Sequence, residues 1–286
     1  MSINRGMTRI IRVFLWLLVF AAVITLFHRR GTNDQPMIET AYTYNIAAVY
    51  PHDSSAFTQG LVYHNGYLYE GTGLYGQSSL RQVRLADGLI RQVVTLPDQY
   101  FGEGIAIVDQ RIIQLTWKEN TGFVYDLETF TLLGTFAYPT EGWGLAYDGE
   151  LLIMSDGSST LTFLDPHTFE PVRQVTVESV AGPVKNLNEL EYINGVIYAN
   201  IWLTDEIAII DPETGFILGW INLSGLRAYL GERFGPQIHQ QIDVLNGIAY
   251  QPETGCLLVT GKLWPLIFAI EVGERPLNLE GRSQGL

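Results

Sequence analysis

Cysteine is almost absent from this chain, because Cys256 is the only one among 286 residues. A single cysteine excludes an internal disulfide and any cluster of thiolate ligands around a metal ion. Cys256 lies in the apolar run 256–259, where a free thiol is expected to pack as a small core residue.

Basic residues are also scarce, with 17 Lys and Arg against 30 Asp and Glu, which gives a formal net charge of −13. All the charged residues among the first 30 positions are arginines, so the rest of the chain is more acidic still. An acidic domain repels phosphate backbones, and nucleic acid is therefore a poor partner.

Several motifs of common enzymes are missing. There is no Gly-x-Ser-x-Gly elbow, no phosphate-binding loop and no dinucleotide fingerprint. The five histidines are scattered and show no metal-ligand spacing, which disfavours a zinc hydrolase or a Ser-His enzyme. Loop carboxylates offer oxygen ligands for a structural Ca²⁺, but no spacing singles out a site.

Only one long hydrophobic run is present, from Val13 to Phe27, with arginines on both sides. Counted from Ile10, with snorkelling flanks, it approaches the roughly 17–20 residues that span a bilayer. The end of this run, Thr25-Leu26-Phe27-His28, is a poor signal-peptidase site. We expect residues 1–30 to be an uncleaved signal anchor, with a cleaved signal peptide as the alternative. Either would place the remainder outside the cytoplasm.

The remainder is repetitive. A polar or aromatic residue followed by a small and apolar run recurs at 59–63, 103–107, 143–147, 188–192 and 246–250. A period in the forties with several short strands per unit is the signature of a β-propeller. The sequence therefore predicts an all-β, five-bladed propeller of four-stranded antiparallel blades over residues 41–273. Residues 31–40 are predicted to be a linker, and residues 274–286 a polar tail.

Strand signals fill each repeat, as β-branched and aromatic residues alternate between turns. Expected strands are 60–63, 67–70, 79–85 and 89–95; 104–108, 111–117, 122–126 and 131–137; 144–147, 151–155, 160–164 and 172–177; 189–193, 196–201, 206–210 and 216–221; and 247–250, 256–260 and 266–272. The last repeat lacks one strand, which the segment 44–49 is expected to supply, so that both ends of the chain close the ring. A short helix is expected at 224–230.

Radial repeats direct equivalent positions toward one axis. The leading residues Gln59, Glu103, Trp143, Asn188 and Asn246 should therefore converge, together with residues at the ends of the second strands, among them Trp117, Trp202 and Lys262. Each has a plainer explanation: tryptophans pack between blades, a glutamate is solvated, an asparagine caps a turn and a lysine snorkels at a rim. Convergence of three indoles with an acid, an amide and an amine favours one site over separate coincidences.

Longer segments carry a family resemblance. They are Phe57–Tyr63, Gly76–Arg81, Phe101–Gly104, Gly142–Ala146, Leu187–Gly195, Asn200–Trp202, Asp243–Ala249 and Val259–Pro265, and they span essentially residues 45–271. In these segments the chain resembles the plant and bacterial type of glutaminyl-peptide cyclotransferase, a five-bladed propeller enzyme. The resemblance implies cyclisation of N-terminal glutamine in peptides and proteins to pyroglutamate, with release of ammonia.

The resemblance also implies roles for particular positions. Glu103 matches the proton-transferring glutamate, and Asn188 and Lys262 match the polar residues beside it. The positions that match the pocket wall are Phe57, Gln59, Trp117, Trp143 and Trp202. No cofactor is required by this chemistry.

The cellular setting and the alternatives complete these expectations. An anchored chain would hold its catalytic domain in the periplasm at the bacterial inner membrane, and a cleaved one would be secreted to the periplasm. We expect the protein to contact the membrane through its N-terminal segment only. A non-catalytic propeller that binds a peptide or other ligand is the main alternative, and another hydrolase or lyase is a weaker one.

Overall fold

The computed structural model describes residues 39–274. The signal anchor predicted for residues 1–30 and its hydrophobic helix lie outside the described residues, as do most of the predicted linker and the tail beyond residue 274. Among the described residues, no helix combines the length and apolar character that crossing a bilayer requires.

The described part is built almost entirely of strands. Three sheets have four antiparallel strands each: β2 (Thr58–His64), β3 (Tyr67–Thr72), β4 (Ser79–Arg84) and β5 (Leu89–Thr95); β6 (Gly102–Val108), β7 (Arg111–Thr116), β8 (Thr121–Asp126) and β9 (Leu132–Ala137); β10 (Leu145–Tyr147), β11 (Leu152–Ser155), β12 (Thr160–Leu164) and β13 (Pro171–Thr176). Within each, consecutive strands are neighbours, so every connection is a hairpin.

A fourth sheet has eight strands in the order β16-β17-β18-β19-β1-β22-β21-β20. Its members are β1 (Thr40–Pro51), β16 (Leu187–Ile193), β17 (Val196–Ile201), β18 (Glu206–Ile210), β19 (Ile217–Asn222), β20 (Leu245–Gln251), β21 (Cys256–Gly261) and β22 (Leu266–Glu274). A small hairpin, β14 (Glu178–Ser179) with β15 (Gly182–Pro183), was not predicted from the sequence.

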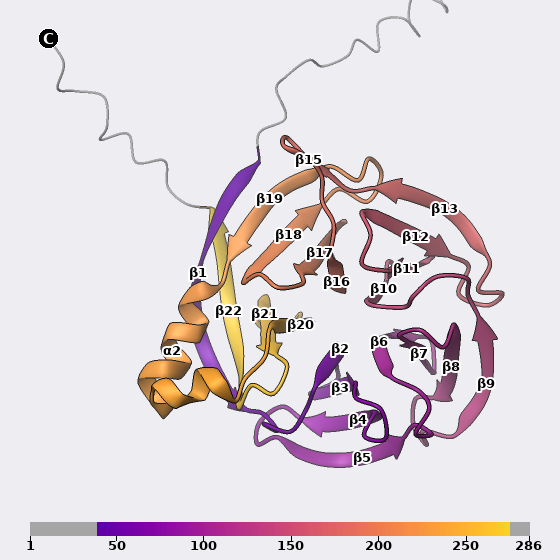
Figure 1. Ribbon diagram of the computed structural model, residues 1–286, viewed down its shortest axis with the longest axis horizontal. Coiled ribbons are helices and arrows are strands. Elements are labelled where there is room, and N and C mark those ends of the chain that lie inside the picture. Colours follow the sequence, from indigo (N-terminus) through magenta and orange to yellow (C-terminus); the bar gives the residue numbers. More distant parts are fainter. Residues whose placement is uncertain (1–38, 275–286) are drawn as a thin grey trace, which may run out of the picture. The chain divides into compact units, whose positions relative to one another are not determined.

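The sheets are arranged radially around a common axis, with β2, β6, β10, β16 and β20 nearest to it (Figure 1). Antiparallel sheets placed in this way form an all-β fold of the β-propeller kind, as the repeats predicted. The predicted strand 44–49 lies in β1, which pairs antiparallel with β22 through Tyr44↔Val272 and Val49↔Phe268. Segments from both ends of the described chain therefore share one sheet.

β1 differs from the prediction at its start. It begins at Thr40, within the predicted linker, and Thr40, Ala41 and Tyr42 pair in parallel with β19. These three pairs join two four-stranded runs into the eight-stranded sheet. The extension occurs because β19 would otherwise present an unpaired edge, which a neighbouring extended segment can satisfy.

The links between third and fourth strands share one turn. Asp126 Oδ1 accepts a hydrogen bond from Thr129 N at 2.8 Å, and Asp165 Oδ1 accepts the equivalent bond from Thr168 N at 2.8 Å. An aspartate that hydrogen-bonds its own backbone a few residues on favours a tight turn. The repeated Asp-x-x-Thr sequence is therefore the local signal that precedes the outer strands β9, β13 and β19.

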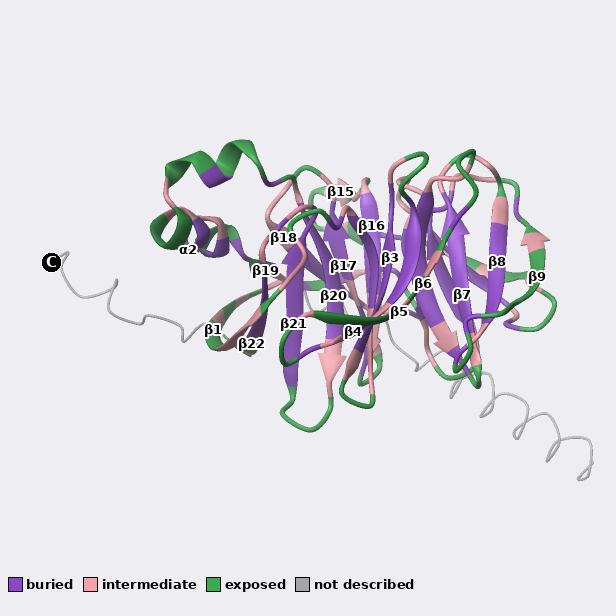
Figure 2. Ribbon diagram, turned by 90° about the horizontal axis from the view of Figure 1, so that it is seen from below, coloured by how far each residue is buried: buried purple, intermediate pink, exposed green. Residues whose placement is uncertain are grey.

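The apolar core lies between the faces of neighbouring sheets. Figure 2 shows β6 and β7 as buried and the outer strand β9 as largely exposed. One cluster joins Ile153 of β11 and Phe163 of β12 to Leu187 of β16 and Ile197 of β17, all fully buried. Since each sheet packs on the next, burial of apolar surface fixes the radial arrangement.

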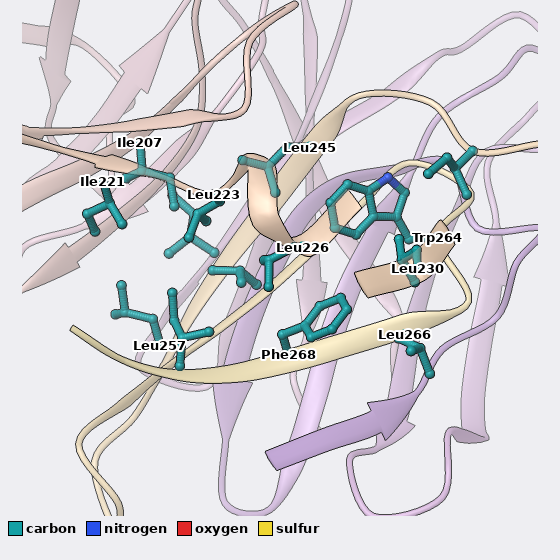
Figure 3. Close-up of a cluster of buried hydrophobic side chains, with 14 of the residues drawn as sticks. Ile207, Ile221, Leu223, Leu226, Leu230, Leu245, Leu257, Trp264, Leu266 and Phe268 are labelled. Atoms are coloured by element: carbon teal, nitrogen blue, oxygen red, sulfur yellow. The ribbon is translucent and has the colours of Figure 1, made fainter. Parts of the chain in front are cut away.

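A helical excursion covers the sheet that contains β21 and β22. α2 (Ser224–Phe234) is longer than the predicted 224–230 and is followed by the 3-10 helix η1 (Pro236–Gln240). Leu226 and Leu230 of α2 pack into the cluster that contains Trp264 and Phe268 (Figure 3). Trp264, the tryptophan nearest in sequence to Lys262, is therefore a core residue.

Glycines next to the axis let the innermost strands approach closely. A Cβ on Gly104 would lie 2.6 Å from the backbone nitrogen of Leu145, and one on Gly144 would overlap the carbonyl oxygen of Asn188. No side chain fits at either position. Glycine is therefore required at these two positions by the radial geometry, and it brings the preceding residue next to the axis.

The fourth repeat has Glu189 where the other four repeats have glycine. Its side chain is buried and crosses to the neighbouring inner strands: Oε1 accepts from Leu61 N of β2 at 3.1 Å, and Oε2 accepts from Ile248 N of β20 at 2.8 Å. One carboxylate therefore connects three inner strands.

Replacing Glu189 by glutamine should lower the free energy of unfolding by about 1–3 kcal/mol, because the amide NH₂ cannot accept a hydrogen bond and leaves one buried backbone N–H unpaired. Urea unfolding of the variant measures the change, with Glu178→Gln in the exposed hairpin β14–β15 as the matched control. Equal midpoints for the two variants would show that the carboxylate does not hold the inner strands together.

Candidate active site

Antiparallel pairing brings the predicted site residues to one end of the ring. Gln59, Glu103, Trp143 and Asn188 stand at or just before the starts of inner strands, while Trp117, Trp202 and Lys262 directly follow the ends of second strands. In an antiparallel pair the start of one strand lies beside the end of its partner. The pairs Gly102↔Thr116, Leu187↔Ile201 and Leu245↔Gly261 show this register.

A β-bulge occurs in four inner strands at this end. The pairing register shifts between Thr58 and Gly60, between Gly102 and Ile105, between Leu187 and Leu190, and between Leu245 and Ile248. The unpaired residues there include Gln59, Glu103, Asn188 and Asn246. A bulge places an extra residue in a strand and redirects its side chain, and bulges are frequent next to active sites.

These side chains line a cavity of about 340 Å³. Its wall contains all eight predicted site residues, Phe57, Gln59, Glu103, Trp117, Trp143, Asn188, Trp202 and Lys262, and three that were not predicted, Phe101, Leu203 and Asp243. Asn246 does not line the cavity. It lies behind Gln59, and its Nδ2 donates to Gln59 Oε1 at 3.2 Å.

Glu103 is the buried acid of the cavity, with 4 % of its surface exposed. Burial raises the pKa of its carboxyl well above the ordinary value; the nearby Lys262 ammonium opposes this rise, and the Glu119 and Glu141 carboxylates add to it. Gln59 Nε2 donates to Glu103 Oε1 at 3.1 Å and fixes the carboxyl group. A carboxyl with a raised pKa is suited to exchange protons near neutral pH.

Asn188 and Lys262 complete the polar part of the wall. They are 3 % and 5 % exposed, and neither side chain has a hydrogen-bond partner among residues 39–274. Burial lowers the pKa of the Lys262 ammonium, and the charges of Glu103 and Asp243 counteract this. Lys262 Nζ lies 4.8 Å from the centroid of the Phe57 ring. Buried donors without a protein partner are free to bind a ligand in the cavity.

Aromatic rings form the rest of the wall. Trp143 and Trp202 meet edge to face with centroids 5.5 Å apart, and Phe101 and Trp117 do so at 5.5 Å. Such pairs enclose apolar groups and exclude water from a cavity.

Glu141 holds two of these indoles in place. Its Oε2 accepts hydrogen bonds from Trp117 Nε1 at 2.8 Å and from Trp143 Nε1 at 3.0 Å. The first tryptophan follows β7 and the second precedes β10, so one carboxylate connects the walls contributed by two sheets. Glu141 was not predicted from the sequence, although an acid two residues before a tryptophan in a Gly-containing turn was a visible signal.

No metal-ligand cluster accompanies the cavity. Within residues 39–274, no group of three or more His, Cys, Asp or Glu side chains is arranged to hold a metal ion. The polar side chains that line the cavity instead comprise two acids, two amides and an amine, a set that can move protons and stabilise a negatively charged oxygen.

Known proteins resemble this chain over most of its length. Residues 17–272 match the model of the glutamine cyclotransferase family. The glutaminyl-peptide cyclotransferase of Arabidopsis thaliana is 42 % identical over 251 residues, which are 86 % of this chain and 77 % of the relative. The crystal structure of Myxococcus xanthus glutaminyl cyclase is 39 % identical with a TM-score of 0.75, and the match covers 83 % of this chain and 100 % of that one.

These observations describe a β-propeller-like protein with a buried acid in a cavity at one end of the ring of sheets. Both the family model and the Arabidopsis relative cover far more than half of the chain. The chain belongs to the glutamine cyclotransferase family.

Proposed function

We propose that this protein is a glutaminyl-peptide cyclotransferase that converts N-terminal glutamine of peptides and proteins to pyroglutamate and releases ammonia. The observation that carries the proposal is the grouping of Glu103, Asn188 and Lys262 in one aromatic cavity. Family membership and the named activities of the two relatives point to the same reaction.

The reaction is intramolecular. The α-amine of the substrate attacks the carbonyl carbon of its own γ-carboxamide, which closes a five-membered ring and expels ammonia. The indoles of Trp117, Trp143 and Trp202 enclose the side-chain methylenes and hold the two ends of the glutamine together. Proximity of this kind contributes several kcal/mol to catalysis.

Glu103 moves the proton. Its carboxylate accepts a proton from the attacking amine as the new N–C bond forms, and its carboxyl then returns a proton to the departing nitrogen, which leaves as NH₃. One residue can act in both directions because burial raises the pKa of its carboxyl above that of an ordinary glutamate, which makes the carboxylate a stronger base.

Asn188 and Lys262 stabilise the intermediate. When the amine adds to the carbonyl carbon, negative charge develops on the former amide oxygen. The unpartnered Nδ2 of Asn188 and Nζ of Lys262 are two donors in the cavity wall that can bind that oxygen. Donors fixed before the charge develops lower the barrier without reorganisation.

The direct test uses the purified protein and a peptide that begins with glutamine. Ammonia release together with a mass loss of one NH₃, and loss of a free N-terminus, would establish the activity. The same peptide with an acetylated N-terminus is the control, since it lacks the nucleophile. Unchanged mass of the free peptide after prolonged incubation would refute the proposal.

Trp143→Ala should raise KM for the glutaminyl peptide about ten- to hundredfold, because it removes one face of the pocket and the apolar contact made there. Steady-state kinetics and the melting temperature are measured together. Trp220→Ala is the matched control, because that indole is partly buried on β19 and donates to Glu39 Oε2 at 2.8 Å. A normal KM with a large fall in melting temperature would mean that Trp143 serves packing alone.

The finer architectural prediction is also part of the proposal. We count five blades, because the eight-stranded sheet divides into β16-β17-β18-β19 and β20-β21-β22-β1, and only three residue pairs between β1 and β19 join them. In this description β1 is the outer strand of the last blade.

The proposal extends to the cell and to cofactors. Residues 1–30 are proposed to anchor the protein in the inner membrane, or to direct its secretion if they are cleaved, with the catalytic domain in the periplasm. The scheme requires no cofactor, and a bound Ca²⁺ would have a structural role only. A non-catalytic binding propeller is disfavoured by the family match and by the complete set of Glu103, Asn188 and Lys262.

A further inference from the structure

The cavity is larger than the glutaminyl residue of the substrate that is proposed to react in it. Pockets of about 300 Å³ and more hold drug-sized ligands, and this cavity has about 340 Å³. A glutaminyl residue is smaller than such ligands, so the cavity has room for part of the residue that follows it in a peptide. The second residue is attached to the carbonyl of the cyclising glutamine, so from there the peptide substrate must extend past the rim of the cavity.

Fixed carboxylates border the rim. Asp243 is exposed, lines the cavity and adjoins Lys262, whose carbonyl accepts from Asp243 N at 2.9 Å. Glu119 accepts from Phe101 N at 3.2 Å and from the Tyr75 hydroxyl at 2.8 Å. Glu141 accepts from the two indoles described above. We call Glu119, Glu141 and Asp243 the acidic rim.

Cations near the acidic rim offset only part of its charge. Lys118 Nζ lies 3.9 Å from Glu141 Oε1 and above the Trp117 ring. Arg227 forms an ion pair with Asp205 at 2.8 Å. Arg227 also donates a hydrogen bond to the backbone carbonyl of Asp243, not to its carboxylate. Lys262 is buried in the cavity. Three carboxylates therefore face one exposed lysine at the rim, in a chain with a net charge of −13.

The buried polar groups fix which end of the substrate faces the rim. Asn188 and Lys262 are more than nine-tenths buried, line the cavity and have no side-chain hydrogen-bond partner within the described range. They are the donors for the γ-carboxamide, and Glu103 must reach the α-amine. With both reacting groups bound at these buried positions, the rest of the peptide extends toward the exposed wall, which contains Asp243 and Leu203.

We infer that the acidic rim selects substrates by the residue after the glutamine: a cationic second residue is favoured, a neutral one is accepted and an acidic one is disfavoured. This selectivity rests on the proposed function. Two unit charges about 7 Å apart in water change an equilibrium by about threefold. Reversing the sign of the second residue should therefore change kcat/KM about tenfold.

Three peptides that differ only in the second residue test the inference. Gln-Lys, Gln-Ala and Gln-Glu peptides with amidated C-termini are compared by kcat/KM at low and at physiological ionic strength. The expected order is Lys above Ala above Glu, with a Lys-to-Glu ratio of about ten that shrinks as salt screens the charges. Equal values for the Lys and Glu peptides at low salt would overturn the inference.

Binding separates this inference from the proposed function. The same three peptides are titrated calorimetrically into the Glu103→Gln variant, which keeps the acidic rim. The affinity order should be the same as the order of kcat/KM. Failure of the wild-type protein to cyclise the Gln-Ala peptide would refute the proposed function, whereas an affinity order without charge dependence would refute the selectivity alone.

Charge-neutralising variants locate the effect. Asp243→Asn keeps an oxygen that can accept from Val244 N, as Asp243 Oδ1 does at 2.6 Å, and should reduce the Lys-to-Glu ratio by about threefold or more. Glu253→Gln is the matched control, because β21 separates that residue from Lys262 by about 20 Å of strand. An unchanged ratio in Asp243→Asn, or an equal reduction in Glu253→Gln, would show that the acidic rim does not read the second residue.

Discussion

Replacing Glu103 by glutamine should lower kcat for cyclisation of a Gln-initiated peptide by about 10²–10⁴-fold, because the variant keeps the shape of the side chain but cannot transfer a proton. KM should change little, since Gln59 and the aromatic wall remain in place. The measurement is ammonia release under saturating substrate. Glu128→Gln, in the exposed turn between β8 and β9, makes the same chemical change without contact to the cavity.

The same variant should not lose stability. Burial raises the pKa of Glu103, so the folded protein disfavours the charged carboxylate relative to the unfolded chain at neutral pH. Removing the ionisable group removes that cost, and the free energy of unfolding at neutral pH should stay constant or increase. A near-normal kcat in Glu103→Gln would show that another group moves the proton.

The raised pKa also sets the acidic limb of the wild-type pH profile. The base form of Glu103 is lost as pH falls through its pKa, so kcat/KM should decline at a pH above the range of an ordinary glutamate. In Glu103→Gln this limb should disappear from the residual activity.

Replacing Lys262 by methionine should lower kcat by about 10²–10³-fold, the usual cost of losing one donor to a developing oxyanion. Methionine has a similar length and no charge, so the packing against Phe57 is retained. Lys185→Met removes the same charge from an exposed position before β16 and is the matched control. An activity within a few-fold of wild type would remove Lys262 from the mechanism.

Two further effects distinguish a catalytic role for Lys262 from a structural one. The ammonium lowers the pKa of Glu103, so its loss should move the acidic limb of kcat/KM to higher pH. Burial lowers the pKa of Lys262 itself, which means that the folded protein bears a cost for its charge near neutral pH. The methionine variant should therefore be as stable as the wild type or more stable in urea unfolding.

Much of the fold could be predicted because its signals are local. Alternating β-branched and aromatic residues between turns located the strands within a few residues; β8, predicted at 122–126, is Thr121–Asp126. The hairpin β14–β15 escaped prediction because its strands have two residues each, and such pairs carry no periodicity. The early start of β1 depends on β19, a partner that is remote in sequence.

The candidate site was predictable for a different reason. Radial repetition places the same position of each repeat near one axis, so the sequence alone predicted that Gln59, Glu103 and Asn188 lie close together, as they do in the cavity wall. The bulges at these positions were not foreseen, since a register shift is a property of two paired strands. Glu141 was missed because its role depends on two indoles from different sheets.

The pairing of β1 with β22 has a consequence for biosynthesis. Of the described strands, β1 leaves the ribosome first, yet both strands that flank it are translated much later, and β22 is the last strand described. Contacts between such distant segments raise the contact order and slow folding. A nascent chain that ends before Leu266 leaves β1 without its antiparallel neighbour, and one that ends before Lys262 lacks the amine as well. Cyclising activity should therefore emerge only after β22 has left the ribosome.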